Sequence, residues 1–185
     1  MQQKLMNTRD IAETACMIEI EQCLEPIGKQ DQYAAAFGGL NFYVIDRIGF
    51  ITVSKNILTY EQEITLTRNL YWGYSGQQRP ASSILQDQKN NLDNRQQSKD
   101  AQQKIVDLAY ESKELLINEE FDTFGLLLDE AWVLKKNLSG LITNPAIDNL
   151  YNLGKTAGAT GAKLLGAGGG GYVLFYVPLE NKAHF

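Results

Sequence analysis

Glycine is concentrated at one point of this chain, immediately before an apolar segment. Five of the six residues from Gly166 to Gly171 are glycine, and the β-branched and aromatic run Tyr172–Val177 follows them. Glycine adopts backbone angles that other residues avoid and allows the main chain to approach a ligand closely. A hairpin turn needs only one or two glycines. The cluster therefore predicts either a loop whose N–H groups hold an anion such as phosphate, or a crowded structural turn.

The better-known glycine motifs do not fit the sequence around this cluster. Gly166, Gly168 and Gly171 match G-x-G-x-x-G, but the dinucleotide fingerprint requires a helix after the glycines, and here a strand is predicted. The glycine loop of protein kinases needs a lysine strand, a catalytic loop and a metal-binding aspartate downstream, and none follows. A Walker A loop has its lysine after the glycines, whereas Lys163 precedes them. The remaining prediction is a strand, a glycine loop and a second strand.

A second segment places one carboxylate among polar neighbours. Asp31 follows Lys29 and Gln30 and precedes Gln32, between a helical segment and a stretch of small residues. A carboxylate close to a cation and amide donors is held ionised and oriented, as a base positioned on a substrate hydroxyl must be. The alternative is an ordinary aspartate at the start of a helix with solvated neighbours.

Together the two segments resemble the GHMP small-molecule kinases, which include galactokinase and the homoserine, mevalonate and phosphomevalonate kinases. The resemblance rests on Gly28–Tyr33 with Phe37–Gly39, and on Gly161–Gly171 far downstream. Within the family the chain most resembles the D-glycero-D-manno-heptose 7-phosphate kinases. Weaker likeness at 70–73 and 79–85 corresponds to the start of the second domain of the family.

This resemblance implies an α+β fold with two parts. Residues 1–70 correspond to the remainder of the N-terminal domain, which is ribosomal-protein-S5-like, and residues 71–185 to the C-terminal domain, a ferredoxin-like α/β sandwich. Family members begin with a substrate-binding strand and a Gly/Ser-rich phosphate loop, and nothing before Asp31 resembles either. We therefore expect an incomplete chain without the N-terminal motifs: a truncated reading frame, a dissected piece or half of a split protein.

The resemblance also implies a function. The expected activity is ATP-dependent phosphorylation of the anomeric hydroxyl of D-glycero-D-manno-heptose 7-phosphate, with ATP and Mg²⁺ as cofactors. Asp31 matches the catalytic carboxylate, and Lys29 either stabilises charge on the transferring group or contacts the sugar phosphate. The implied nucleotide-phosphate residues are Gly166, Gly168, Gly169, Gly170 and Gly171, and the implied substrate residues are Gln30, Gln32, Arg79, Ser82 and Ser83. The alternatives are a galactokinase- or fucokinase-like enzyme, or a non-catalytic sugar- or nucleotide-binding fragment.

The charge and composition of the chain limit the kinds of molecule that it is expected to bind. A formal charge of −5 and a pI near 4.9 argue against nucleic acid and against a basic membrane-binding patch. No apolar run has the length of a membrane span, and the N-terminus lacks the apolar core of a signal peptide. Cys16 and Cys23 are seven residues apart in a predicted helix, too far for a disulfide, which suits the cytoplasm. His184 is the single histidine, so no metal site is expected. The expected partners are a small sugar phosphate and, through unpaired sheet edges, a second copy or a complementing N-terminal half.

Periodicity predicts the elements between these motifs. The first is a helix from Asn7 or Thr8 to Leu24, with Ile11, Ala15 and Ile18 on its buried stripe. Paired strands are expected at 40–45 and 49–53, and further β structure at 64–67 and 70–72. The remaining predictions are an exposed helix–loop–helix at 86–104, helices at 105–116 and 121–134 with Gly140 at the helix end, and a helix capped by Asn144 and Pro145.

Overall fold

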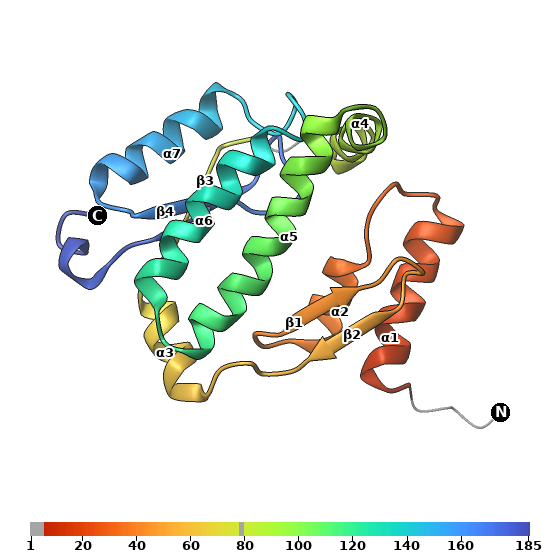
Figure 1. Cartoon of the computed structure of the whole chain (residues 1–185), viewed down its shortest axis with the longest axis horizontal. Helices are drawn as coiled ribbons and strands as arrows, with labels where there is room; N and C mark the ends of the chain where they lie inside the picture. The colour runs from red at the N-terminus through yellow and green to blue at the C-terminus, as the bar shows by residue number, and fades with distance from the viewer. Residues whose placement is uncertain (1–5, 78–79) are drawn as a thin grey trace. The chain divides into compact units, whose positions relative to one another are not determined.

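The computed structural model describes residues 6–77 and 80–185 and divides the chain into two compact units, Met1–Thr59 and Tyr60–Phe185 (Figure 1). Both units combine helices with a small antiparallel sheet, which is the predicted α+β composition. Within the described ranges, no helix has both the length and the apolar character needed to cross a membrane.

The first unit packs two helices against a strand pair. Its elements are α1 (Thr8–Cys16), which continues as the π-helix η1 (Met17–Gln22), α2 (Gln30–Phe37), β1 (Phe42–Ile45) and β2 (Ile51–Ser54). Asn7 begins α1 through a capping box. The Asn7 side chain accepts from the N–H of Asp10 at 2.9 Å, and the Asp10 carboxylate accepts from the N–H of Asn7. β1 and β2 are antiparallel, with Phe42 opposite Ser54. The predicted helix start and strand pair are confirmed.

The buried face of α1 is not the predicted one. Ala12 and Cys16 are buried with Tyr33 of α2 and Ile51 of β2, whereas Ile11 and Ile18 are 50% and 43% exposed. The prediction that Ile11, Ala15 and Ile18 form one buried stripe was therefore wrong for Ile11 and Ile18, while Ala15 is half-buried. The helix carries apolar residues on two faces, and only contacts with α2 and β2 decide which of them is covered.

The second unit places its helices around a three-stranded antiparallel sheet with the strand order β3-β5-β4. Two of its helices, α5 and α6, lie side by side in Figure 1 and form an antiparallel pair. The elements are α3 (Tyr60–Arg68), β3 (Leu70–Tyr74), α4 (Ala81–Asn94), α5 (Gln96–Ile117), α6 (Phe121–Lys136), α7 (Pro145–Ala157), β4 (Gly161–Leu164), β5 (Tyr172–Tyr176) and the short 3₁₀ helix η2 (Leu179–Asn181).

The core of this unit joins α6 and α7 to the sheet, with Trp132 as its largest buried side chain. Gly154 of α7 lies against the ring of Phe175 with no room for a Cβ, so glycine brings the helix close to the strand. The cluster consists of Ile84, Ala101, Trp132, Leu138, Ile142, Ile147, Ala159, Ala162, Leu164, Val173, Phe175 and Val177.

Some of the helices lie where they were predicted and others do not. The helix–loop–helix is confirmed as α4 and α5, but it is not exposed throughout, because Asn91, Ser98 and Ala101 are buried. Asn144 caps α7 by accepting from the N–H groups of Ala146 and Ile147. Residues 64–67 were predicted as β structure and instead lie in α3, where the Thr65 and Thr67 hydroxyls bond the carbonyls one turn back. β-branched residues favour strands only weakly, and tertiary packing overrides them. Gly140 does not end a helix, because α6 stops at Lys136.

Candidate functional site

The glycine cluster lies between β4 and β5, as predicted. The two strands are antiparallel, with Leu164 opposite Val173, and the N–H of Leu165 donates to the carbonyl of Tyr172 at 2.8 Å. A strand, glycine loop and strand therefore follow one another in the second unit.

One side of this loop packs tightly against the chain. The φ angle of Gly168 is +130°, and a Cβ built at this residue would lie 2.8 Å from the Cα of Ile142. The N–H of Gly169, where φ is +72°, donates to the carbonyl of Ile142 at 2.8 Å. Positive φ and close approach each favour glycine, so the predicted crowded turn accounts for these two residues.

The ends of the loop are different. Gly166 and Gly171 have φ angles of +76° and +103°, but a Cβ at either would meet no atom within 4 Å. The carbonyl of Gly171 accepts from the N–H of Ser75, and its own N–H donates to the carbonyl of Gln77, both at 2.9 Å. Crowding therefore does not explain all of the glycines, and open space borders the loop at Gly166 and Gly171.

Asp31 is exposed in the first turn of α2, in the first unit. The Lys29 ammonium, which the sequence places near this carboxylate, is directed elsewhere. It lies 3.4 Å from Glu13 Oε2 of α1 and 3.3 Å from the carbonyl oxygen of Gly49. The cation that was expected to orient Asp31 is thus paired with Glu13, a residue sixteen positions earlier.

The amides beside Asp31 behave differently from each other. Gln30 is exposed, whereas Gln32 is buried and donates from Nε2 to Glu19 Oε2 at 3.0 Å. Its Oε1 atom is buried without a hydrogen-bond partner among the described residues. Gln32 therefore points towards the helical segment η1, and its substrate role stays a prediction.

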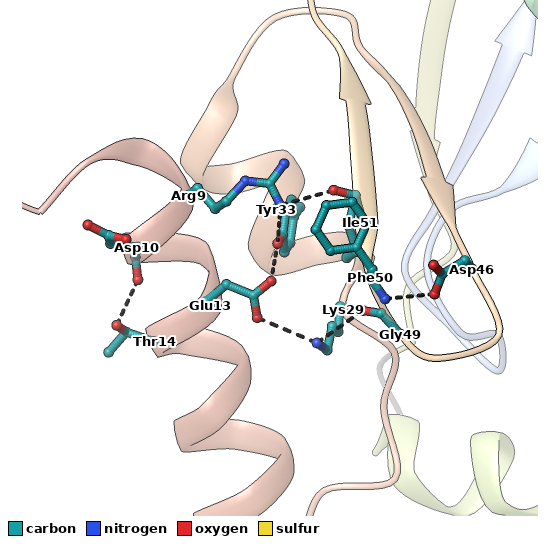
Figure 2. Close-up of polar contacts among 10 residues, drawn as sticks. All are labelled: Arg9, Asp10, Glu13, Thr14, Lys29, Tyr33, Asp46, Gly49, Phe50 and Ile51. Atoms are coloured by element: carbon teal, nitrogen blue, oxygen red, sulfur yellow. Dashed lines mark hydrogen bonds and ion pairs between the residues drawn. The ribbon is translucent and has the colours of Figure 1, made fainter.

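A polar cluster that the sequence analysis missed joins α1, α2 and β2 (Figure 2). The Tyr33 hydroxyl donates to Glu13 Oε1, and Arg9 donates to the carbonyl of Ile51 at 2.9 Å and contacts the Tyr33 hydroxyl at 3.4 Å. Lys29 completes the set through its ion pair with Glu13. Arg9 and Glu13 are four residues apart, so their i, i+4 spacing was the available signal.

The cluster shifts the ionisation of two of its members. The hydrogen bond from Tyr33 lowers the pKa of Glu13, burial opposes that effect, and Lys29 reinforces it. Burial, followed by the hydrogen bond to Glu13, raises the pKa of Tyr33 to about 12. A cavity of about 330 Å³ adjoins Glu13 and Lys29; its lining is Glu13, Thr14, Cys16, Met17, Ile20, Glu21 and Lys29.

The remaining predicted substrate residues lie at the start of α4. Ser82 and Ser83 are in its first turn, where the Ser83 hydroxyl donates to the carbonyl of Pro80 at 3.4 Å. Arg79 lies outside the described residues. Asp31 belongs to the first unit and the glycine loop to the second, so the predicted site residues are distributed over both. Their roles stay predictions.

With this geometry in place, comparison with known proteins identifies the fold. Residues 112–184, which include the glycine loop, match the family model described as GHMP kinases C terminal. The chain contains a GHMP kinase C-terminal domain. It is 33% identical over 177 residues to a D-glycero-alpha-D-manno-heptose 7-phosphate kinase of Campylobacter jejuni, an alignment that covers 94% of this chain and 51% of the relative.

Other known proteins share part of the sequence or the fold of this chain. A bifunctional fucokinase/GDP-fucose pyrophosphorylase of Arabidopsis thaliana is 35% identical over 80 residues, which are 43% of this chain and 8% of that protein. A solved D-glycero-D-manno-heptose 1-phosphate kinase from Bacteroides thetaiotaomicron superposes with a TM-score of 0.72 at 22% identity, over 97% of this chain and 48% of that one. The mevalonate kinase of L. major superposes with a TM-score of 0.73 at 16% identity, over 97% of this chain and 52% of that one.

These comparisons show the GHMP kinase fold. They also show that the chain spans about half the length of the heptose kinase relative and of the superposed kinases.

Proposed function

We propose that this chain is part of an ATP-dependent GHMP sugar kinase that phosphorylates the anomeric hydroxyl of D-glycero-D-manno-heptose 7-phosphate. The observation that carries the proposal is the 33% identity, along 94% of this chain, to a heptose 7-phosphate kinase. The glycine loop between β4 and β5 adds a region where backbone N–H groups and small residues suit a phosphate.

Asp31 is proposed as the carboxylate that accepts or orients the proton of the attacking hydroxyl. It is exposed in the first turn of α2, and no described side chain bonds to it in the structure. Phosphoryl transfer depends mainly on positioning and on stabilising charge, so the proposed carboxylate and phosphate loop are two of the parts that the reaction needs. Lys29 is paired with Glu13 in the first unit, and its ammonium group has three N–H donors, so the proposed contact with the sugar phosphate would compete with or add to that ion pair.

We propose that Mg²⁺ enters the site chiefly bound to the nucleotide. No group of three or more His, Cys, Asp or Glu residues gathers in the part of the chain that the structure describes. Mg²⁺ typically binds one or two carboxylates together with substrate phosphates and water. When bound, the ion would neutralise charge on the β- and γ-phosphates of ATP, and Asp31 is the exposed carboxylate of the proposed site.

The domain assignment is part of the proposal. Residues 1–70 would belong to the S5-like N-terminal domain of the family and residues 71–185 to its ferredoxin-like C-terminal domain. Because the chain spans about half of its relatives, we propose that activity requires the other half of the kinase, and that a homodimer is the alternative assembly. The free thiols of Cys16 and Cys23 suit a cytoplasmic location.

The second candidate substrate is fucose or galactose. The 35% identity over 80 residues to a bifunctional fucokinase favours fucose specifically. Phosphorylation rates with heptose 7-phosphate, fucose and galactose distinguish the candidates, since a kinase acts preferentially on the sugar whose transition state its site binds most tightly.

The deciding experiment is phosphorus NMR of the purified chain with Mg-ATP and D-glycero-D-manno-heptose 7-phosphate. It is run with the chain alone and with the unmatched half of the Campylobacter relative added as a separate polypeptide. We expect an anomeric phosphate signal and ADP in the mixture. If the mixture forms a stable complex that produces neither signal, the proposed substrate is wrong.

A further inference from the structure

Three carbonyl groups of the glycine loop are bound by side chains that come from three different helices. Lys135 Nζ of α6 donates to the carbonyl of Gly166. Gln88 Nε2 of α4 donates to that of Ala167 at 3.1 Å, over a separation of 79 residues. The amide of Asn144, at the start of α7, donates to that of Gly169 at 3.1 Å.

These bonds determine the direction of three N–H groups. A peptide unit is planar and trans, so its C=O and the following N–H point in opposite directions. When the carbonyls of Gly166, Ala167 and Gly169 face the helices, the N–H groups of Ala167, Gly168 and Gly170 face away from those donors. Within the described residues, no acceptor is bound to these three N–H groups.

The other two N–H groups of the loop are occupied. Gly169 donates to the carbonyl of Ile142 and Gly171 to that of Gln77. The φ angles around the first free pair also alternate, since Gly166 and Gly168 have positive φ and Ala167 does not. Such alternation turns successive N–H groups to one side and forms an anion-binding concavity.

We propose that Gln88, Lys135 and Asn144 are positioning residues, which hold the loop so that the N–H groups of Ala167, Gly168 and Gly170 receive phosphate oxygens of the nucleotide. This inference rests on the proposed kinase function. The three side chains touch no substrate. They hold the loop carbonyls towards the helices. Gly168 is buried, and because a buried N–H without an acceptor is costly, its N–H group favours binding of an acceptor such as a phosphate oxygen.

The test is a pyrophosphate titration of the ¹⁵N-labelled full chain in the presence of Mg²⁺, followed by amide NMR. We expect the signals of Ala167, Gly168 and Gly170 to shift, and those of Gly169 and Gly171 to move less because their N–H groups already have acceptors. Equal shifts at all five amides, or none at the first three, would overturn the proposal.

The contribution of Gln88 is measured with Gln88→Ala. We expect affinity for pyrophosphate to fall by about fivefold to tenfold, as for the loss of one well-placed hydrogen bond. Gln86→Ala is the matched control, because Gln86 lies on the same helix and, among the described residues, donates to Asn90 and not to the loop. Asn144→Ser gives a second variant, since serine keeps the helix cap but is too short to reach Gly169.

A merely structural role for Gln88 would lower stability without changing which amides respond. Equal affinities of Gln88→Ala and Gln86→Ala, with Asn144→Ser also unchanged, would show that these side chains position nothing. The kinase proposal fails separately: pyrophosphate shifts at the three amides, in a complex that phosphorylates no heptose, would leave the loop assignment intact and remove the substrate.

Discussion

The main chain of Gly168 lies directly against that of Ile142. A Cβ at residue 168 would come within 2.8 Å of the Ile142 Cα, and the next residue, Gly169, donates its N–H to the Ile142 carbonyl at 2.8 Å. Because backbone is packed on backbone here, no side-chain rearrangement can make room for a larger residue. The middle of the glycine loop is therefore fixed in place, while Gly166 borders open space.

This relationship predicts a difference between two alanine substitutions. Gly166→Ala introduces only the strain of positive φ, about 1–2 kcal/mol. Gly168→Ala adds overpacking against Ile142, a further 1–3 kcal/mol or so. Urea unfolding of both variants measures the difference in the free energy of unfolding. Equal destabilisation of the two variants would show that the backbone at Ile142 shifts at little cost to accommodate a Cβ at residue 168.

Asp31→Asn is expected to reduce phosphoryl transfer by the assembled kinase by about 10²-fold or more, as for loss of a general base. The exposed position of Asp31 predicts little change in folding. The measurements are steady-state rates and thermal unfolding. Asp93→Asn is the control, since Asp93 is an exposed carboxylate on α4. A variant of Asp31 that retains activity within a few fold of the original removes it from the mechanism.

Tyr33→Phe is expected to destabilise the chain in a pH-dependent manner. The hydrogen bond from Tyr33 is the largest cause of the lowered pKa of Glu13. A carboxylate with a lowered folded-state pKa contributes stability above its unfolded value, here 4.5, and loses it as the pH falls through the folded value. The penalty for Tyr33→Phe should therefore be present at pH 7 and shrink below pH 4.5.

At alkaline pH the change in stability with pH depends on the ionisation of Tyr33 itself. Its pKa is raised to about 12 from 10, so its contribution is complete below pH 10 and is lost as the pH rises through about 12. Urea unfolding of the original chain and of Tyr33→Phe across this range checks both limits. Tyr60→Phe, at an exposed tyrosine, is the control. A penalty that stays constant from pH 3 to pH 7 would contradict the role of Glu13.

We expect the other half of the proposed kinase to bind the exposed apolar residues of α1 and η1. Ile11 of α1 and Ile18 of the following η1 are exposed, whereas Ala12 and Cys16 are buried. A helix with apolar residues on two faces is typical of helices covered on both. Ile18→Glu should therefore weaken binding of the unmatched half of the Campylobacter relative by roughly tenfold or more.

Calorimetry with that half as a separate polypeptide measures the effect of Ile18→Glu. Leu153→Glu is the control, because Leu153 is similarly exposed but lies on α7. Equal binding by both variants would exclude this face of α1 as the contact. Self-association of the chain that only Ile18→Glu abolishes would favour the homodimer instead.

The sequence was most informative where the signal is local. The box that begins α1 at Asn7 and the cap that begins α7 at Asn144 are both present, because a capping side chain bonds N–H groups only two or three residues away. The strand, glycine loop and strand also follow from short-range properties, since the β-branched and aromatic run Tyr172–Val177 comes directly after a cluster of glycines.

Where the local preference is weak, the sequence predicted secondary structure less reliably and did not predict the long-range contacts. Ile64–Thr67 has the composition of a strand but completes the helix α3. The Gln- and Asn-rich stretch at 86–104 was correctly predicted as helical, although its side chains gave no sign that Gln88 would reach the glycine loop.

The sequence by itself determined the two family motifs, the helix caps and the glycine loop, because each of these depends on residues that are close together in the chain. Tertiary structure alone decided that Ala12 rather than Ile11 is buried and that Lys29 pairs with Glu13 instead of Asp31. It also brought Gln88 to the carbonyl of Ala167 across 79 residues. Such contacts are selected by packing among whole elements, and no short stretch of sequence contains both partners.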